Sequence, residues 1–345
     1  MDLELSADHA LLFDSVRDFV RAEVAPQAGA WAHAGGLPRG AWEAATRLGL
    51  AGIRAPEAFG GAEMDGLALA VAIEAVAAAS GSLAWVLAVH NALALGHALH
   101  VGDGGLIAAL ASGRFIGGFA ALPEVRATST GDGWRLVGRG EGITLDPVRG
   151  VLVLIASSAE GPTAFQVDAR TVKFQRARTL GMAAASVGAI ELDGPGQLVG
   201  GVGQAGAVVE AVQREAAPVF AALSVGLGQG ALEAGLRYAT ERRQFGRPIS
   251  DFQAIQWMLA DAGTELEAAR LLGRRAAASG DVADGLAARI LSAEAGLAAA
   301  DRALQIHGGA GYTKDYPVER CWRDAQRLLV GVDAARAALG QLTCA

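Results

Sequence analysis

The chain has 345 residues, which is long enough for two or three domains around a large core. Hydrophobic residues make up 52% of it, and the formal net charge of −7 argues against nucleic acid as a bulk electrostatic partner. That charge leaves room for a local basic site that binds a phosphate-bearing ligand. Two cysteines, Cys321 and Cys344, are too few for a disulfide framework and favour a reducing, cytoplasmic location.

The pattern of residues 1–112 predicts a helical domain. Ser6 is placed to cap a helix that starts near Ala7, and Pro26 ends this first segment. The apolar stretch 71–99 is interrupted by Glu74, His90, Asn91 and His97, so we expect buried helix and no membrane span. The N-terminus is acidic and lacks the basic and apolar segments of a signal peptide.

Residues 113–197 predict a small β domain. Short runs rich in valine, isoleucine and aromatic residues are bounded by Gly, Asp or Pro, as is typical of strands. A Thr-Gly-Asp-Gly turn at 130–133 predicts a hairpin. The expected strands are 134–137, 151–155, 163–167 and 189–192.

Residues 198–345 predict a second helical domain. Long amphipathic stretches joined by short turns are typical of a four-helix bundle. The expected helices are 205–242, 252–279, 282–306 and 319–342. The fold class is therefore mostly α with a small β domain between two helical domains.

The turn between the first two bundle helices carries the sequence Glu-Arg-Arg-Gln-Phe-Gly-Arg-Pro, followed by Gln253. An arginine such as Arg242 can hold a pyrophosphate through two parallel charge-assisted hydrogen bonds. An aromatic residue such as Phe245 can pack on a nucleotide ring. The alternative is a charged helix end with Arg242 in solvent and Phe245 in the core.

A second motif, Gln-Ile-His-Gly-Gly-Ala-Gly-Tyr, begins at Gln305. The Gln305 amide can both donate and accept hydrogen bonds, and Gly308 and Gly309 let backbone approach a ligand closely. The double glycine could instead end a helix, and for His307 we favour a packing role over catalysis. We expect the charged residues after this motif to form a structural ion-pair network rather than a ligand site; they are Asp315, Arg320, Arg323 and Asp324.

Together these two motifs resemble the acyl-CoA dehydrogenase family, and the order of helices, small β domain and bundle resembles its architecture. The resemblance implies FAD as cofactor. It implies that Arg242 and Phe245 touch the FAD of an adjacent protomer. It implies that Gln305, Gly308 and Gly309 form the other part of this FAD contact. Gln253 follows the Phe-Gly motif at the spacing that the family shows.

The family's catalytic base has no counterpart in this chain. Family members usually carry a glutamate in a Tyr-Glu-Gly-Thr stretch, whereas residues 327–336 here contain none. A subset of the family places the glutamate on the first bundle helix, at a position occupied here by Ala216. Glu215 and Asp333 each lie one residue from a required position, so they are weak candidates, and we assign no catalytic residue.

The middle domain also departs from the family pattern. Residues 121–128 keep a proline but lack the family's Thr-Glu-Pro and Gly-Ser-Asp stretches. From the family's Lys-x-Trp-Ile-Thr run, which covers the flavin ring, only Ile143 and Thr144 are kept. Thr144 is either a flavin contact or an ordinary strand residue. The histidines and cysteines show no metal-ligand spacing.

Three functions stay open at this point. The first is a subunit of an α2β2 complex that completes the FAD site of a related catalytic chain, whose glutamate removes the α-proton of an acyl-CoA. The paired-subunit resemblance suggests steroid breakdown and a bulky polycyclic acyl-CoA, with an electron-transferring flavoprotein as one candidate acceptor. The second is an active homo-oligomeric FAD dehydrogenase, oxidase or oxygenase with a relocated base. The third is a scaffold that binds no flavin.

Overall fold

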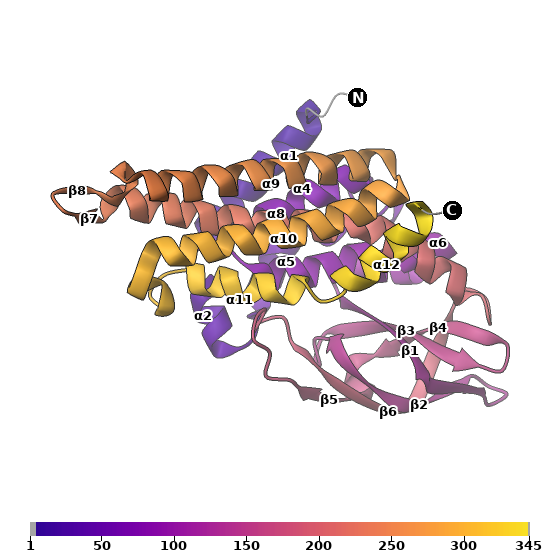
Figure 1. The fold of residues 1–345 in the computed structure, drawn as a ribbon. Helices are drawn as coiled ribbons and strands as arrows, with labels where there is room; N and C mark the ends of the chain where they lie inside the picture. Colours follow the sequence, from indigo (N-terminus) through magenta and orange to yellow (C-terminus); the bar gives the residue numbers. More distant parts are fainter. Residues whose placement is uncertain (1–4, 344–345) are drawn as a thin grey trace.

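The computed structural model describes residues 5–343 and places three units side by side. Helices of the N-terminal part pack against the long bundle helices, and the β domain lies below one end of them (Figure 1). The predicted fold class, mostly α with a small barrel-like β domain, is confirmed.

The N-terminal unit contains seven α-helices among the described residues, several with side-chain caps at their first turn. Ser6 accepts a hydrogen bond from the His9 amide at 3.3 Å, as the sequence predicts. Asp65, Ser80 and Asp103 cap later helices in the same way. The helices are α1 (Ala7–Phe19), α2 (Ala28–Ala34), α3 (Arg39–Arg47), α4 (Gly66–Ala77), α5 (Gly81–Ala88), α6 (Gly96–Val101) and α7 (Gly104–Ala111), with π-helical turns at Val20–Val24 and Val89–Leu95 and a 3-10 turn at Glu57–Phe59.

The middle unit is a six-stranded sheet that closes on itself. The strand order is β2-β1-β3-β4-β6-β5, and an additional β2–β6 pairing joins the two sides. The predicted hairpin turn is present, since the Thr130 amide bonds to the Gly133 carbonyl at 2.9 Å. The strands are β1 (Ile116–Ser129), β2 (Trp134–Thr144), β3 (Gly150–Ser158), β4 (Gly161–Asp168), β5 (Lys173–Arg176) and β6 (Val187–Val199). Neither β1 nor β5 was among the four strands expected from the sequence, although the predicted hairpin implies a strand before residue 130.

The C-terminal bundle is built around α8, which spans 37 residues. Its closest neighbours, α4 and α10, approach it through small residues. A Cβ on Gly226 would lie 2.2 Å from the Glu74 carbonyl oxygen, and one on Gly230 would lie 2.0 Å from that of Ala78. The bundle helices are α8 (Ala205–Glu241), α9 (Gln253–Ser279), α10 (Val282–His307), α11 (Val318–Leu328) and α12 (Val332–Thr343).

The last predicted bundle helix, 319–342, is wrong as a continuous element. The chain leaves the helix after Leu328 and enters α12 at Val332. Gly331 has a φ of +92°, which a left-handed turn requires and a continuous helix forbids. The break lies within the segment where the family resemblance places the glutamate motif.

Two segments, Gly81–Val101 and Ala205–Glu241, are long and apolar enough to cross a membrane. In the fold, 83% and 67% of their apolar windows are buried against other elements. Core helices show this burial, in keeping with the buried helix expected at 71–99. The Cys321 thiol is buried, which raises its pKa to about 11, and Cys344 lies outside the described residues.

Asp324 joins the β domain to the bundle. This buried carboxylate on α11 accepts a hydrogen bond from the Met182 amide, in the loop between β5 and β6. Burial raises the pKa of Asp324 from 3.8 to about 6, against the lowering effect of that hydrogen bond and of Arg320. The folded state therefore binds this proton more tightly than the unfolded chain does.

Stability should depend on pH through this group. A raised carboxyl pKa contributes stability below pH 4 that is lost as the pH rises through about 6, by about 3 kcal/mol for the full shift. In Asp324→Asn the amide oxygen still accepts the Met182 hydrogen bond but does not titrate. Urea unfolding at pH values on either side of this window should show the smaller loss in the variant. The exposed Asp315→Asn should leave the wild-type pH profile unchanged, and an equal loss in wild type and Asp324→Asn would contradict the assignment.

Candidate functional site

The first predicted motif forms a hairpin that projects from one end of the bundle (Figure 1). Its strands are β7 (Arg243–Gln244) and β8 (Arg247–Pro248), paired antiparallel. The Ile249 amide bonds to the Arg242 carbonyl at 2.8 Å and closes the base of the hairpin. The Arg242 side chain is exposed at that base.

Phe245 lies at the hairpin tip, where both its solvent exposure and its backbone conformation are unfavourable. Its side chain is 92% exposed, and its φ of +51° is a left-handed conformation that a bulky side chain rarely adopts. Such a residue costs about 1–3 kcal/mol of strain and tends to occur where function requires it. The alternative that Phe245 belongs to the core is therefore wrong.

The second motif lies at the same end of the bundle. The His307 ring stacks on Tyr238 with centroids 4.2 Å apart and meets the edge of Tyr316 at 5.2 Å. His307 Nδ1 bonds to the Ala303 carbonyl at 2.8 Å, and burial lowers the pKa of the ring. The packing role expected for His307 is confirmed, and it fixes the first motif against the second.

Gly308 and Gly309 of the second motif differ in why glycine occupies the position. Gly308 has a φ of +55°, so it ends α10 as a helix-stopping glycine would. Gly309 has no positive φ, and a Cβ built on it would meet no atom within 4 Å. Nothing in this chain demands glycine at position 309, which favours a role in the close approach of another molecule.

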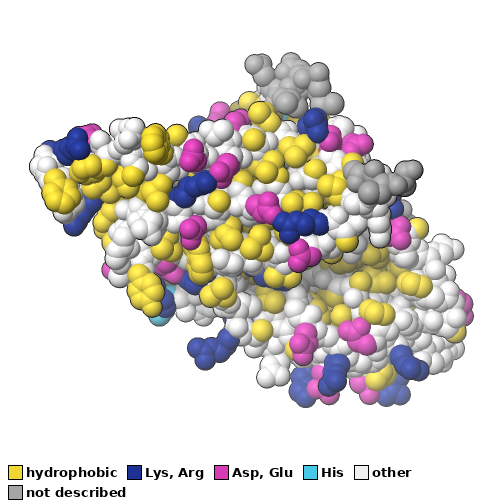
Figure 2. Space-filling model, viewed as in Figure 1, with side chains coloured by type: hydrophobic (Ala, Val, Ile, Leu, Met, Phe, Trp, Pro, Cys, Tyr) yellow, Lys and Arg dark blue, Asp and Glu magenta, His cyan; other side chains and the backbone are white. Residues whose placement is uncertain are grey.

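Together the predicted residues form an exposed face that we call the bundle-end surface. All six of its residues are exposed. Figure 2 shows hydrophobic and basic side chains gathered on this protruding end. The members of the bundle-end surface are Arg242, Phe245, Gln253, Gln305, Gly308 and Gly309.

Thr144 occupies a separate, inner position at the end of β2. It is 8% exposed, and its hydroxyl accepts a 2.7 Å hydrogen bond from the Trp85 indole nitrogen. The cavity that Thr144 lines measures about 30 Å³, room for about one or two water molecules. Thr144 is a buried strand residue whose hydroxyl accepts from Trp85 and keeps its own O–H to donate, so a flavin contact stays a prediction.

The inner position and the bundle-end surface are far apart within one chain. Trp85 bonds to Thr144 and packs on Phe220 of α8, with ring centroids 5.3 Å apart. Arg242 follows Phe220 by 22 residues along the same helix, a rise of about 33 Å. A ligand part held by Thr144 and a part held by Arg242 therefore belong to sites in different protomers or to different ligands.

Neither weak base candidate faces the inner position. Glu215 accepts hydrogen bonds from Arg54 at 2.7 Å and from His100 at 2.8 Å. Burial alone would raise the pKa of Glu215, but these two partners lower it overall, so it is a poor proton acceptor. The Asp333 side chain is 96% exposed and pairs with Arg336. Ala216 is buried in an apolar cluster.

Two arginines that the sequence analysis missed lie beside Trp85. The Arg327 guanidinium is 4.9 Å from the Trp85 ring, and that of Arg289 is 5.6 Å from the Phe220 ring. Burial and the charge of Arg327 lower the pKa of Arg289 to about 10. Arg289 Nη1 is buried without a hydrogen-bond partner among the described residues. No motif marks these positions, because only the folded helices bring them together.

The two regions differ in how they fit the FAD implied by the sequence. The bundle-end surface offers an exposed arginine, an aromatic ring, an amide and close backbone access, which suit a nucleotide cofactor. The cavity that Thr144 lines, about 30 Å³, is too small for a flavin ring as it stands. We therefore derive no reaction step through a flavin bound at Thr144.

Family models match most of the chain. Residues 6–104 match the acyl-CoA dehydrogenase N-terminal domain, and residues 207–331 match the acyl-CoA dehydrogenase C-terminal domain. Glutaryl-CoA dehydrogenase of Desulfococcus multivorans is 34% identical over 94% of this chain and 92% of its own. A probable acyl-CoA dehydrogenase of Bacillus subtilis is 30% identical over 96% of both chains.

Solved structures agree with this assignment. A glutaryl-coenzyme A dehydrogenase in complex with glutaryl-CoA superposes with a TM-score of 0.91 at 31% identity, over 99% of this chain and 97% of that one. Butyryl-CoA dehydrogenase of Megasphaera elsdenii has the same fold, with a TM-score of 0.94 at 23% identity over the full length of both chains.

The strain at Phe245 is measurable. Phe245→Gly should raise the free energy of unfolding of the isolated chain by about 1 kcal/mol, because glycine adopts a positive φ without steric cost. The control is the exposed neighbour Gln244 in β7, where Gln244→Gly should lower it by about 0.5–1 kcal/mol. Urea unfolding measures both. A Phe245→Gly variant less stable than wild type would show that Phe245 stabilises its own chain.

Proposed function

Since the chain belongs to the acyl-CoA dehydrogenase family, we propose that it is the partner subunit of an FAD-dependent acyl-CoA dehydrogenase. In this proposal its bundle-end surface completes the FAD site of a related catalytic chain. Members of this family are oxidoreductases that act on CH–CH bonds, and an acyl-CoA thioester is the substrate of the complex. The observation that carries the proposal is that Arg242 lies 22 residues beyond Phe220, a helical rise of about 33 Å, whereas Phe220 packs on Trp85 at the inner position.

The exposure of the bundle-end surface supports a role toward another chain. Phe245 and Tyr312 are 92% and 90% exposed, which is costly for two aromatic rings unless a partner covers them. Gly309 has no packing requirement in its own chain. An arginine and an aromatic residue beside an open glycine suit the pyrophosphate and ring of a dinucleotide.

The inner region supports a non-catalytic role. Proton removal from an acyl α-carbon needs a positioned base, worth about 10²–10⁴ in rate. Ala216 is apolar there, Glu215 is engaged by Arg54 and His100, and Asp333 points into solvent. In the complex, FAD supplies the hydride acceptor and the catalytic chain supplies the base.

An active homo-oligomer is the competing function, since relatives match nearly the whole chain at 30–34% identity. A homo-oligomer would place the bundle-end surface against the inner region of an identical neighbour, where the cavity that Thr144 lines measures about 30 Å³. Cytoplasmic location, steroid breakdown, the α2β2 stoichiometry and the electron-transferring flavoprotein stay predictions from the sequence.

FAD content distinguishes the two functions. The chain purified alone should contain far less than one FAD per protomer, whereas the complex recovered with a co-expressed catalytic homologue should contain one FAD per catalytic protomer. Flavin absorbance after denaturation measures both. One FAD per protomer in a stable homotetramer of this chain would sink the partner-subunit proposal.

Arg242→Ala should weaken FAD retention in the complex by about 10–150-fold, the value of a lost charge-assisted hydrogen bond. The matched control is Arg47→Ala, an exposed arginine on α3 that forms no ion pair among the described residues. The variant complexes are dialysed against FAD-free buffer and their residual flavin is compared. Equal retention in both variants would remove Arg242 from the cofactor site.

A further inference from the structure

A small pocket lies between α6 and the first turn of α8, at the opposite end of α8 from the bundle-end surface. Its volume is about 280 Å³, just below the range of about 300–1,000 Å³ typical of pockets for drug-sized ligands. It therefore suits a molecule smaller than a nucleotide, and it shares no lining residue with the inner cavity. The residues that shape it are His97, His100, Val101, Val199, Gly200 and Val208.

His97 lines this pocket from α6 with both ring nitrogens unpaired. The residue is fully buried, and neither Nδ1 nor Nε2 has a hydrogen-bond partner within residues 5–343. His90, equally buried, has both nitrogens paired, because Nε2 donates to the Ala51 carbonyl at 2.9 Å and Nδ1 accepts from the Gly117 amide at 2.8 Å. A buried polar group without a partner costs free energy, so the unpaired ring beside a pocket indicates a missing ligand.

The charge state of His97 makes it a neutral donor. Burial, and to a smaller extent the charge of His100, lowers the pKa of His97 to about 4. The ring is therefore neutral near pH 7 and offers one N–H donor. His100 follows three residues later on the same face of α6, but its Nε2 is already bonded to Glu215 at 2.8 Å. His97 is thus the histidine of the pocket whose ring is free to bind a ligand.

The first turn of α8 supplies further donors. Gln204 at the N-cap forms no side-chain capping hydrogen bond, and the first turn contains no acidic residue. The amides of Ala205, Gly206 and Ala207 donate to no acceptor in the described part of the chain. Free amides at the positive end of a helix dipole favour an oxyanion. No carboxylate is among the described residues that line the pocket, so none of them competes for these donors.

The remaining walls are apolar. Val101, Val199 and Val208 line the pocket, and a Cβ on Gly200 would lie 3.0 Å from Val101 Cγ1. Glycine therefore lets the chain after β6 pass close to α6. A fully hydrated ion such as phosphate would lose water against these valines without gaining polar partners there. A short hydrocarbon chain would instead gain from covering them.

We propose that this pocket binds a short aliphatic monocarboxylate. Its carboxylate accepts hydrogen bonds from His97 and from the first-turn amides of α8, and its hydrocarbon chain lies against the valines. Because the pocket is formed by α6, by the segment after β6 and by α8, the ligand joins parts of all three units. A ligand that binds only the folded chain should also raise the urea midpoint of unfolding.

Calorimetric titration of the full chain with pentanoate tests the site. His97→Leu should weaken binding by about 10–150-fold, the value of a lost hydrogen bond to a charged group. The same variant without ligand should unfold at a urea midpoint no lower than that of wild type, because leucine removes an unpaired buried polar group. His33→Leu, an exposed histidine on α2, should bind pentanoate as wild type does.

Val208→Asp tests the site without changing the core, since Val208 is half-buried. The new carboxylate lies in the first turn of α8, where it attracts the free amides and repels a carboxylate ligand, so pentanoate binding should weaken at least about tenfold. The matched control is Val148→Asp, which adds the same charge at an exposed valine between β2 and β3 and should leave binding unchanged.

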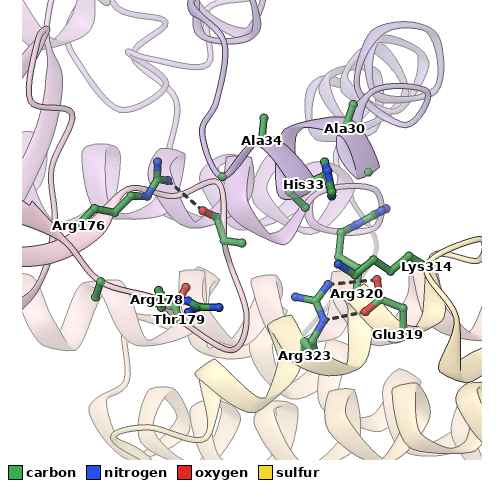
Figure 3. A pocket seen from close by; sticks show the side chains of 15 residues that line it. Ala30, His33, Ala34, Arg176, Arg178, Thr179, Lys314, Glu319, Arg320 and Arg323 are labelled. Atoms are coloured by element: carbon green, nitrogen blue, oxygen red, sulfur yellow. Dashed lines mark hydrogen bonds and ion pairs between the residues drawn. The ribbon is translucent and has the colours of Figure 1, made fainter.

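A basic groove between α2 and the start of α11 is the control for general attraction of anions. Figure 3 shows basic side chains on opposite sides of it, among them Arg178 and Lys314. Arg178→Ala should bind pentanoate as wild type does. Weakening by Arg178→Ala as large as that by His97→Leu would place the ligand outside the proposed pocket and overturn the proposal.

Further ligands test the chemical class. Propionate, which has two fewer methylenes to bury, should bind about tenfold more weakly than pentanoate. Inorganic phosphate should bind more weakly still. The proposal is overturned if pentanoate does not bind, if it binds His97→Leu and Val208→Asp as it binds wild type, or if phosphate binds more tightly than pentanoate. FAD content plays no part in these measurements, so this site and the bundle-end surface can fail independently.

Discussion

Helix α8 sets the geometry on which the rest of the structure depends. It runs for 37 residues, about 55 Å, from the β domain to the hairpin, and it packs against α4 and α10 through glycines that admit no larger side chain. A helix held this closely along its length fixes the distance between its two ends. The features at its C-terminal end cannot bend back to the inner position near Phe220, so they face solvent in the single chain.

The sequence predicted the elements of the outward-facing site well because its signals are local. A Gly-Arg-Pro turn ends one helix, a double glycine ends another, and each breaks its pattern through its own backbone chemistry. The stack of Tyr238 on His307, which brings the two motifs together, depends on the packing of α8 on α10. From the sequence, only the order of the helices and the resemblance to a family indicated that the two motifs lie close together.

The inner region was harder to predict because its contacts join residues far apart in the chain. Trp85 and Thr144 are 59 residues apart, and neither has a distinctive local pattern. Arg289 and Arg327 come from different helices, and burial together with the charge of Arg327 lowers the pKa of Arg289. Strand β5 and the break before α12 were missed for a related reason, since a four-residue edge strand and one glycine carry little periodic signal.

The inner region carries positive charge from Arg289 and Arg327. Trp85 contacts Arg327 on one face and donates to Thr144, so cation, ring and hydroxyl form one connected unit. Guanidiniums beside a carboxylate stabilise its charged form and lower its basicity. Because a general base needs a pKa near the working pH, such a carboxylate would be poorly matched to proton removal. The lack of a base at position 216 and the presence of these arginines are both consistent with the partner-subunit role proposed above.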